Sequence, residues 1–255
     1  MGSGCPALPR PVSVCLSAGE SLTSAGYRAH REQKADKILA VLQDFLGDLS
    51  GLRCLDIGCN RGVIAVRLAE AFGSVIGVDL EVPELHRAWI EEPRANLRFV
   101  HADGSRLPFS AGHFDVIVCA QVYEHMQAQQ ALAAEVWRVL RPGGVCFFSG
   151  PNRWTLIEEH YWLPFLSWLP APLADRYVRL FRGQPRYDVW PLSYWQLRSL
   201  WRNFRVHDYT VPMLKSPERF GLTMKLLRWL RYLPTGLLKL LLPIVPNYNW
   251  ILVKR

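Results

Sequence analysis

The sequence predicts an α/β fold built on a mostly parallel sheet of seven strands, with helices on both faces and helical inserts near the C-terminus. Two observations predict it. Short apolar, strand-like runs alternate with helical patterns over residues 51–150, and continuous apolar strands are typical of parallel sheets that are covered on both faces. Polar residues also stand at the ends of successive strands, where open parallel sheets bind their ligands.

Apolar spacing and turn residues define the elements of the first 150 residues. A helix is expected over 27–47, because apolar residues recur there at helical spacing and Gly47 closes the pattern. Short strands are expected over 53–58, 74–80, the start of 97–109, 114–121 and 145–150, and further helices over 62–73, 83–92 and 131–140.

The alternation lapses after Pro151. Residues 151–203 are rich in Trp, Tyr, Pro and Arg and are expected to be irregular and helical. Two strands are expected over 204–211 and 248–255, separated by a helix-prone stretch over 216–242 that breaks at Pro234 and Gly236. We therefore divide the chain into a disordered arm (1–21), an N-terminal helical segment (22–50), a core (51–150), an aromatic-rich lid (151–203) and the last two strands (204–255) with a basic amphipathic insert (212–246).

The net charge of +8 is concentrated near the C-terminus. Residues 1–150 carry 14 basic and 16 acidic side chains, residues 151–210 carry 8 and 5, and residues 211–255 carry 8 and 1. A basic surface often indicates a nucleic-acid partner. Because this charge is confined to one segment rich in leucine, we expect an anionic surface that is met locally, and no nucleic acid.

The six cysteines are scattered and fit a reducing compartment. No CxxC pair and no Cys/His ligand spacing occurs, so no metal site is expected. No apolar run reaches the roughly 20 residues that a membrane span needs. We expect a cytoplasmic protein, with possible peripheral contact at the inner face of a membrane.

The stretch LDIGCNRG, residues 55–62, is typical of a loop that holds a nucleotide-like cofactor. Two cofactor classes compete for it. A dinucleotide loop has the spacing G-x-G-x-x-G, whose central glycine lets the backbone approach the pyrophosphate. Here Gly58 and Gly62 lie four residues apart without that glycine. S-adenosylmethionine has no phosphate and suits this spacing better.

Five stretches carry a family resemblance: LDIGCNRG, GVDL, HADGSRLPF, FDVIVCAQVYEH and RPGG. In this order and spacing they resemble the class I S-adenosylmethionine-dependent methyltransferases, and most of all the small-molecule branch that includes the ubiquinone/menaquinone-biosynthesis-type enzymes. The resemblance implies a Rossmann-like sheet with an antiparallel last strand. The family loop reads D-x-G-C-G-x-G, and this chain departs from it at Asn60. Asparagine tolerates the left-handed conformation well, so the departure is mild. Arg61 is expected to lie in solvent.

The resemblance also implies a role for each matching residue. Asp79 would accept hydrogen bonds from both ribose hydroxyls, and Asp103 would accept one from the adenine amino group. Gln121 and Val122 would lie beneath the methyl donor. The expected cofactor-binding residues are Asp56, Gly58, Asn60, Gly62, Asp79, Leu80, Asp103, Gly104, Gln121 and Val122. The alternative is that the glycines only turn the chain and the aspartates only cap helices.

Two histidines are candidates for removing a proton from an acceptor hydroxyl. His125 follows the fourth strand, and His160 lies in the lid, with Glu124 and Glu159 as side chains that orient them. A structural role for His125 is an equal alternative. The expected acceptor-binding residues are Trp154, His160, Tyr161 and Trp162. Ordinary packing of a small helical cap would explain the same aromatic residues.

The stretch 216–242 mixes basic residues with leucine and tryptophan at helical spacing. This pattern is typical of helices that lie on a membrane surface, and its alternatives are a dimer interface or a cap on the protein's own core. The function indicated is methyl transfer to a small-molecule or lipid-like acceptor, most simply to oxygen. The alternatives are an NAD(P)-dependent oxidoreductase and a non-catalytic, membrane-associated binding protein with the same fold. The oligomeric state is left open.

Overall fold

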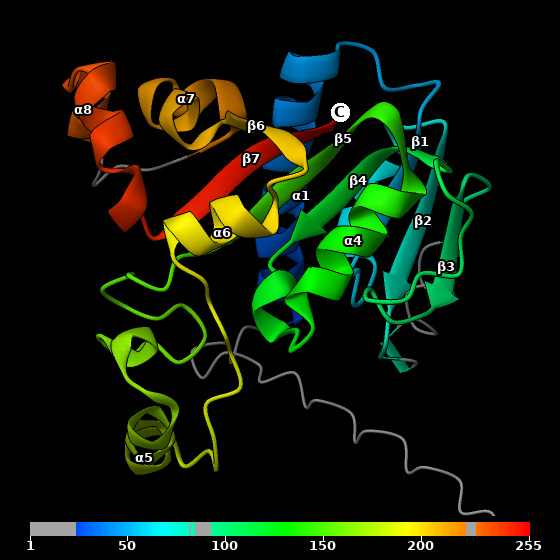
Figure 1. Ribbon diagram of the computed structural model, residues 1–255. Helices are drawn as coiled ribbons and strands as arrows, with labels where there is room; N and C mark the ends of the chain where they lie inside the picture. The colour runs from blue at the N-terminus through cyan, green and yellow to red at the C-terminus, as the bar shows by residue number, and fades with distance from the viewer. Residues whose placement is uncertain (1–23, 82, 85–92, 223–227) are drawn as a thin grey trace, which may run out of the picture.

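The computed structural model describes residues 24–81, 83–84, 93–222 and 228–255 (Figure 1). The predicted disordered arm and most of the predicted helix over 83–92 lie outside the described residues. Seven strands form one sheet in the order β3-β2-β1-β4-β5-β7-β6. Their bounds are β1 Arg53–Ile57, β2 Ser74–Asp79, β3 Leu97–His101, β4 Phe114–Ala120, β5 Leu140–Pro151, β6 Phe204–Asp208 and β7 Asn247–Lys254.

The direction of the strands confirms the predicted fold class. Neighbouring strands from β3 to β5 pair in parallel, and β7 pairs antiparallel with both β5 and β6. The last strand therefore runs against the others. Most residues of the inner strands β1 and β4 are buried, as a sheet covered on both faces requires.

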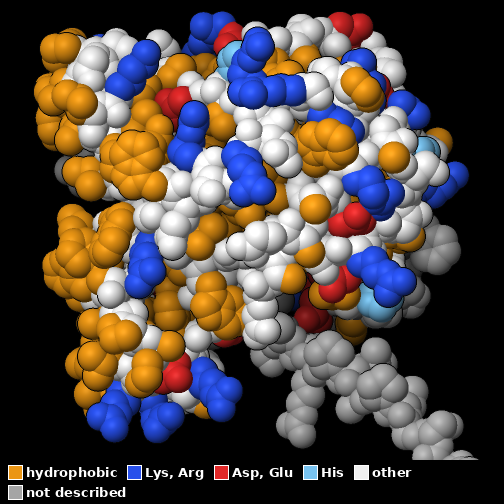
Figure 2. Space-filling model, viewed as in Figure 1, with side chains coloured by type: hydrophobic (Ala, Val, Ile, Leu, Met, Phe, Trp, Pro, Cys, Tyr) orange, Lys and Arg blue, Asp and Glu red, His pale blue; other side chains and the backbone are white. Residues whose placement is uncertain are grey.

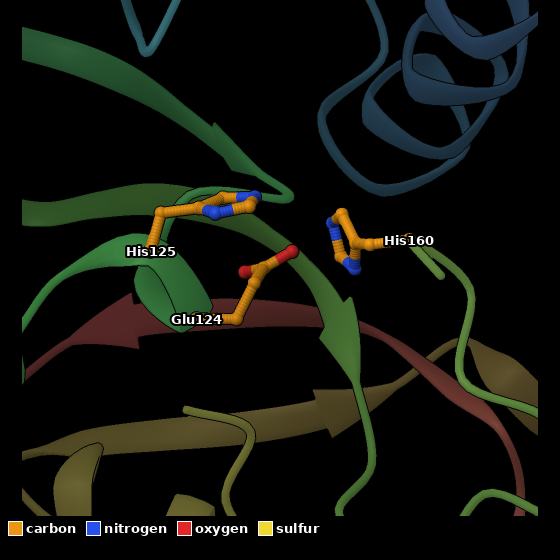
Figure 3. A group of neighbouring side chains, drawn as sticks. All are labelled: Glu124, His125 and His160. Carbon is orange, nitrogen blue, oxygen red and sulfur yellow. The ribbon is translucent and has the colours of Figure 1, made fainter. Parts of the chain in front are cut away.

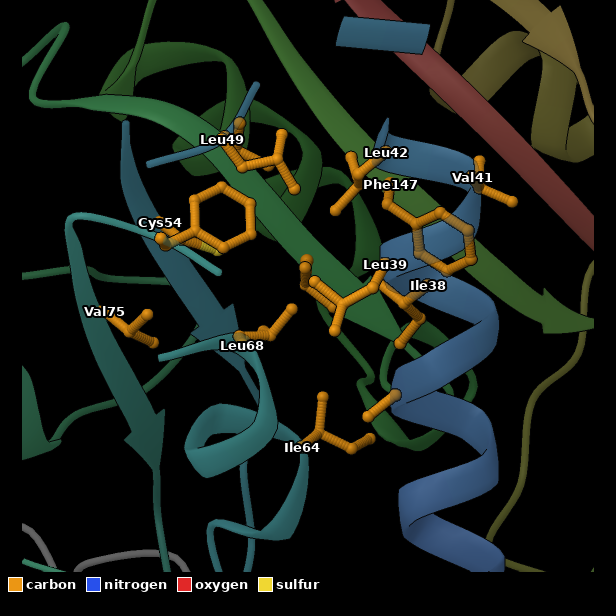
Figure 4. Packing of buried hydrophobic residues seen from close by; sticks show 14 of the residues in the cluster. Ile38, Leu39, Val41, Leu42, Leu49, Cys54, Ile64, Leu68, Val75 and Phe147 are labelled. Atoms are coloured by element: carbon orange, nitrogen blue, oxygen red, sulfur yellow. The ribbon is translucent and has the colours of Figure 1, made fainter. Parts of the chain in front are cut away.

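Helices cover both faces of the sheet. One face packs against α1 (Ser24–Leu46) and α2 (Val63–Leu68), and Ile38, Leu42 and Leu68 of these helices belong to the same buried cluster as the strand residue Phe147 (Figure 4). The other face packs against α4 (Gln129–Val139) and α6 (Tyr194–Leu200), which lie in front of the sheet in Figure 1. Truncating a fully buried leucine such as Leu42 to alanine costs about 2–5 kcal/mol.

The lid has a small core of its own, in which Tyr161, Leu166 and Val178 are buried. It contains the 3₁₀ helix η2 (Leu166–Trp168) and the helix α5 (Ala171–Arg182). Figure 1 places it beyond the ends of β4 and β5. A short 3₁₀ helix, η1 (Tyr123–His125), lies between β4 and the lid, and the N–H of Trp190 donates to the carbonyl of Glu124 at 2.7 Å.

Two boundary predictions near the C-terminus were wrong. The strand predicted over 204–211 ends at Asp208, because α7 (Thr210–Lys215) begins there and Oδ2 of Asp208 accepts a hydrogen bond from the N–H of Val211 at 3.0 Å. Gly236 lies inside α8 (Thr235–Leu240) and not at a break. The other described helices of the insert are 3₁₀ turns: η3 (Pro217–Phe220), η4 (Arg228–Tyr232) and η5 (Leu242–Ile244).

Candidate functional site

Polar side chains stand at the carboxyl ends of four adjacent strands. Asp56 lies one residue before the end of β1, Asp79 ends β2, Asp103 follows β3 and Gln121 follows β4. The strands are parallel neighbours, and their registers align these ends at one edge of the sheet. The structure thus brings the predicted strand-end residues together.

The loop after β1 is left-handed at three positions. The backbone angle φ is +74° at Gly58, +48° at Asn60 and +74° at Gly62. The N–H of Gly58 donates to the carbonyl of Val78 at 2.8 Å, which joins the loop to β2. A Cβ on Gly58 would lie 2.6 Å from Cγ2 of Val122. Glycine is therefore required there by conformation and by space.

Asn60 keeps this backbone shape, and its backbone N–H donates to Oδ2 of Asp79 at 2.7 Å, as the N–H of a glycine could also do. Its side chain adds contacts that glycine lacks. Its side-chain Oδ1 accepts hydrogen bonds from the Tyr27 hydroxyl at 3.0 Å and from the N–H of Arg61 at 2.8 Å. The asparagine therefore joins the loop to the first helix, α1.

The side chain of Arg61, which we expected to lie in solvent, is 38% exposed and also has two partners. Its Nε donates to a carboxylate oxygen of Glu84 at 2.6 Å, and its guanidinium lies 5.2 Å from the ring centre of Tyr27. The aromatic ring and the carboxylate both attract the guanidinium cation.

Asp79 is held by backbone groups and keeps capacity for more. Oδ2 accepts from Asn60, and Oδ1 accepts from the N–H of Glu81 at 3.0 Å. A carboxylate offers about four acceptor positions, so each oxygen has room for one further donor. The neighbouring Leu80 is 58% exposed, which leaves an apolar side chain beside the carboxylate.

Asp103 and Gly104 form the turn after β3. Oδ1 of Asp103 accepts from the N–H and the hydroxyl of Ser105, both at 2.7 Å, so the aspartate caps its own turn. A Cβ on Gly104 would lie 3.1 Å from Cγ2 of Ile57, so the turn packs closely against the end of β1.

Asp56 is a buried carboxyl group with an unused oxygen. It is 2% exposed, and its Oδ2 has no hydrogen-bond partner. Burial raises its pKa to about 8, although the nearby charge of Arg31 on α1 acts in the opposite direction. A buried acceptor without a donor at the ligand edge of a parallel sheet is the environment of a binding residue.

Gln121 adopts a strained backbone beyond β4. Its φ is +59°, and its N–H donates to the carbonyl of Ser149 on β5 at 2.8 Å. A left-handed conformation at a residue other than glycine costs on the order of 1–3 kcal/mol and is concentrated at functional sites. Val122 follows it and contacts the glycine loop as described above.

Glu124, His125 and His160 form a second cluster, on the lid side of this edge. One ligand atom from each residue lies within 4.8 Å of those of the other two. Figure 3 shows the carboxylate of Glu124 pointing toward the space between the two imidazole rings, whose centres are 4.8 Å apart. Two segments 35 residues apart in the sequence thus meet at one point.

Burial sets the charge of this cluster. It raises the pKa of Glu124 to about 7 and lowers the pKa of His125 to about 4, where the charges of His160 and Arg31 act in the same direction. Burial alone would lower the pKa of His160 too, but the hydrogen bond and the charge of Glu158 raise it above its usual value. His125 is therefore neutral at pH 7.

Glu158, and not the predicted Glu159, orients His160. Its carboxylate accepts hydrogen bonds from the backbone N–H of His160 at 2.9 Å and of Tyr161 at 2.6 Å, and Nδ1 of His160 lies 2.8 Å from its other oxygen. This buried carboxylate shapes the turn that carries the histidine.

The predicted acceptor residues do not share one place. Tyr161 is 1% exposed in the core of the lid, where its hydroxyl donates to Asp188 at 2.7 Å, which is the environment of a structural residue. Trp154 and Trp162 are exposed, and the ring of Trp154 contacts that of Trp168. Of the four, His160 is the one that the structure places against His125.

Comparison with known proteins identifies the central part of the chain. A protein family described as "Methyltransferase domain" matches residues 55–148, which include the glycine loop and the ends of β1 to β4. Residues 55–148 are thus similar to this methyltransferase family. The ubiquinone biosynthesis O-methyltransferase of Psychrobacter cryohalolentis is 34% identical over 110 residues, which are 41% of this chain and 43% of that protein.

Two further proteins are similar to this chain, one in sequence and one in fold. A probable S-adenosylmethionine-dependent methyltransferase of Mycolicibacterium smegmatis is 37% identical over 42% of this chain and 40% of that protein. The chain thus matches less than half the length of these relatives. A methyltransferase structure from Mesorhizobium loti shares the fold, with a TM-score of 0.57 and 18% identity over 87% of this chain and 100% of that one.

The site fits S-adenosylmethionine, the cofactor named for one of these similar methyltransferases. The unpaired Oδ2 of Asp56 offers an acceptor for a cationic amino group, and Asp79 offers acceptors for two hydroxyls. The glycine at position 58 makes room for the side chain of Val122, whose Cγ2 would lie 2.6 Å from a Cβ there. The four cysteines among the described residues, Cys54, Cys59, Cys119 and Cys146, are buried free thiols.

The sequence analysis missed the contribution of α1. Tyr27 and Arg31 lie four residues apart on this helix, and Arg31 lies 5.3 Å from the ring centre of Tyr27. The sequence shows that Tyr27 and Arg31 share one helix face. It does not indicate that this face contacts the loop at Asn60, which lies 33 residues after Tyr27. The role of Glu158 was missed for the same reason, because it depends on how the lid turns.

Proposed function

We propose that the chain is an S-adenosylmethionine-dependent methyltransferase that acts on an oxygen atom of a small or lipid-like acceptor. The observation that carries the proposal is the carboxylate of Asp79, held in place by the N–H groups of Asn60 and Glu81 beside the glycine loop. A bidentate acceptor at the end of β2 suits a ribose. The loop lacks the central glycine of a pyrophosphate cradle, which disfavours the NAD(P) alternative.

Each strand end has a proposed partner on the cofactor. Asp79 accepts from the ribose hydroxyls, Asp103 accepts from the adenine amino group and Leu80 covers the adenosine with its exposed side chain. The methionine end lies along the loop, next to Asp56. The other residues proposed to contact the cofactor are Gly58, Asn60, Gly62, Gly104, Gln121 and Val122.

Methyl transfer requires the protein mainly to align the methyl donor with the acceptor and to exclude water from the pocket. S-adenosylmethionine, when bound, supplies a methyl group on a sulfonium that is already activated for displacement. Gln121 and Val122 support the donor end, and the lid excludes water. His125 and His160 lie on the lid side of the donor and are the candidates that remove the proton from the acceptor hydroxyl. The neutral state of His125 at pH 7 allows it to interact with that proton.

Oxygen as the acceptor atom is supported by relatives, since several are described as O-methyltransferases of ubiquinone biosynthesis. An apolar acceptor is supported by the surface of this chain. All the large apolar side chains that are exposed among the described residues, except Leu80 and Trp137, follow Pro151. The most exposed are Leu156, Leu180, Trp195, Tyr232, Leu240 and Ile244.

We call the exposed large apolar side chains that follow Pro151 the apolar face. Figure 2 shows hydrophobic side chains gathered over the lid and over the region of α8, with Lys and Arg side chains between them. Exposed aromatic and aliphatic residues mixed with cations are typical of proteins that lie on an anionic membrane. Among the described residues, no helix is long and apolar enough to cross a bilayer. We propose peripheral contact through this face, at a membrane that presents a lipid-like acceptor.

A calorimetric titration with S-adenosylhomocysteine and, in parallel, with NADH tests the cofactor. Binding of S-adenosylhomocysteine without binding of NADH is expected, and the reverse would contradict the proposal. Transfer of a labelled methyl group to a lipid extract then separates an enzyme from a non-catalytic protein of the same fold. Cofactor binding without transfer to any extracted component would favour the non-catalytic alternative.

A further inference from the structure

The cluster of Glu124, His125 and His160 has the composition of a metal site. Two imidazoles and one carboxylate approach a common point, with their ligand atoms within 4.8 Å of one another. Around an ion with bonds of about 2.1 Å, tetrahedral ligand atoms lie about 3.4 Å apart. The three side chains therefore need to close by no more than about 1.4 Å, a distance that small changes in side-chain rotamers cover.

Glu124 is the observation that points to a ligand. Its side chain is 0% exposed, and neither of its carboxylate oxygens has a hydrogen-bond partner. Buried carboxylates in proteins are almost always paired, hydrogen-bonded or bound to a metal. Figure 3 shows this carboxylate directed at the space between the two histidines.

His160 is already prepared for such a role. Its Nδ1 lies 2.8 Å from the buried carboxylate of Glu158. Metal-binding histidines commonly donate their second ring nitrogen to a carboxylate, which fixes the tautomer and makes the other nitrogen a better ligand. With Nδ1 taken by Glu158, Nε2 is the nitrogen that remains for an ion.

We propose that Glu124, His125 and His160 bind a divalent transition metal ion of the zinc type, with the carboxylate of Glu158 holding the imidazole of His160 through its Nδ1. Two imidazole nitrogens and one carboxylate oxygen suit borderline ions such as Zn²⁺ and Co²⁺ better than Mg²⁺ or Ca²⁺, which prefer oxygen ligands. Three protein ligands leave at least one coordination position open, as in catalytic zinc sites.

The surrounding charges are compatible with a cation. Two positive side chains of α1 act on the cluster. Arg31 lowers the pKa of His125, and Lys34 lowers the pKa of Glu124. They are opposed by the carboxylates of Glu124, Glu158 and Glu159, all of which act on His160. Lys37 acts on Glu159 as a third cation, so three carboxylates are balanced by three positive side chains, and a divalent ion would bind in place of any proton on His160.

The role of the metal rests on the proposed methyltransferase function, whereas the metal site itself does not. A metal-bound hydroxyl group has a lowered pKa and loses its proton to water near neutral pH. Its oxygen then forms a bond to the methyl carbon, the carbon–sulfur bond breaks, and the bonding electron pair stays on sulfur. In this scheme the metal would take over the proton-removing role that the proposed function gives to His125 and His160, and the two histidines would act as its ligands.

Titration of the full chain with Co²⁺ tests the site, because cobalt replaces zinc and its visible absorption reports the ligands. One saturating equivalent is expected, and Zn²⁺ should displace it. His160→Asn and Glu124→Gln should each weaken binding at least a hundredfold, and Glu158→Gln should weaken it about ten- to a hundredfold. His101→Asn, at an exposed histidine that ends β3, is the matched control and should bind as the wild type does.

Three outcomes would overturn the metal site. They are the absence of a saturating equivalent, equal affinity in His160→Asn, and an intense near-ultraviolet band, which would place cobalt on a cysteine thiolate. Circular dichroism establishes that each variant is folded. Titration of the same samples with S-adenosylhomocysteine keeps the two ideas apart. Cofactor binding without cobalt binding rejects the metal alone, and cobalt binding without cofactor binding rejects the proposed function alone.

Discussion

The backbone N–H of Asn60 donates a hydrogen bond of 2.7 Å to Oδ2 of Asp79, and this bond joins the loop after β1 to the end of β2. The departure from the family loop thus lies in direct contact with the residue proposed to bind the ribose. The side chain of Asn60 extends the connection to Tyr27 on α1. A helix outside the methyltransferase match is therefore part of the site.

Replacing Asp79 by alanine is expected to weaken binding of S-adenosylhomocysteine ten- to a hundredfold. A charged acceptor of two hydroxyls would be lost, at a cost on the order of 1.5–3 kcal/mol. Calorimetry measures the change. Asp36→Ala, on α1 in an exposed ion pair with Arg67, is the control and should leave the affinity unchanged. Equal affinity of the Asp79 variant and the wild type would remove Asp79 from the site.

Substitutions at Asn60 should separate backbone strain from the contact with α1. Asn60→Gly keeps φ of +48° without strain but loses the acceptor for the Tyr27 hydroxyl. Asn60→Ala loses the same acceptor and adds about 1–2 kcal/mol of left-handed strain. The free energy of unfolding in urea should therefore be lowest for Asn60→Ala, with Tyr27→Phe close to Asn60→Gly. If the alanine and glycine variants are equally stable, the strain argument fails.

Alanine substitutions at two glycines distinguish a steric clash from the strain of a left-handed backbone. Gly58→Ala would place a Cβ 2.6 Å from Val122, whereas Gly112→Ala, at a similar φ of +68°, has no atom nearer than 3.8 Å. Both variants should lose about 1 kcal/mol from the left-handed backbone. Gly58→Ala should lose more, and its affinity for S-adenosylhomocysteine should fall at least tenfold while that of Gly112→Ala is kept. Similar losses in both variants would contradict a close approach at Gly58.

The sequence predicted the sheet and the strand-end residues because both follow from local patterns. Asp56, Asp79 and Gln121 stand at the ends of apolar runs, and parallel strands align such ends by geometry. The partners of Arg61 and His160 were predicted wrongly or not at all. Glu84 contacts Arg61, and Glu158 contacts His160. Both contacts depend on the direction of chain turns, which no periodic pattern in the sequence predicts. For the same reason the sequence did not predict the cluster of Glu124, His125 and His160, which combines residues that follow β4 with a residue of the lid.

Stability should fall with rising pH because of Asp56. Its pKa is about 8 in the folded protein and 3.8 for an ordinary aspartate, so the folded state holds a proton that the unfolded state has released. Unfolding free energy then decreases between about pH 4 and pH 8, by at most about 1.4 kcal/mol per pH unit, and levels off above. Asp56→Asn has a similar shape and no titration there, so its decrease should be smaller. Urea unfolding of the wild type and of Asp56→Asn at pH 5.5 and at pH 7.5, about two units apart within that window, measures the two decreases in unfolding free energy. Identical slopes would show that Asp56 is not protonated in the fold.

The apolar face should bind anionic vesicles. Trp229 and Tyr232 of η4 are exposed by 57% and 81%, and residues 211–255 carry 8 basic and 1 acidic side chains, so insertion of the rings and attraction to anionic headgroups act together. We expect flotation with phosphatidylserine-containing vesicles, weaker flotation with phosphatidylcholine alone, and loss of binding at high salt.

The double variant Trp229→Ser/Tyr232→Ser should bind such vesicles about tenfold more weakly, since two rings no longer leave water. Trp137→Ser is the matched control, because Trp137 is also exposed but lies on α4, outside the apolar face. If the control loses as much binding as the double variant, the contact is not specific to this face. If the wild type stays in solution with both kinds of vesicle, the exposed side chains of the lid and insert serve another partner, and a second copy of the chain becomes the first alternative to test by light scattering.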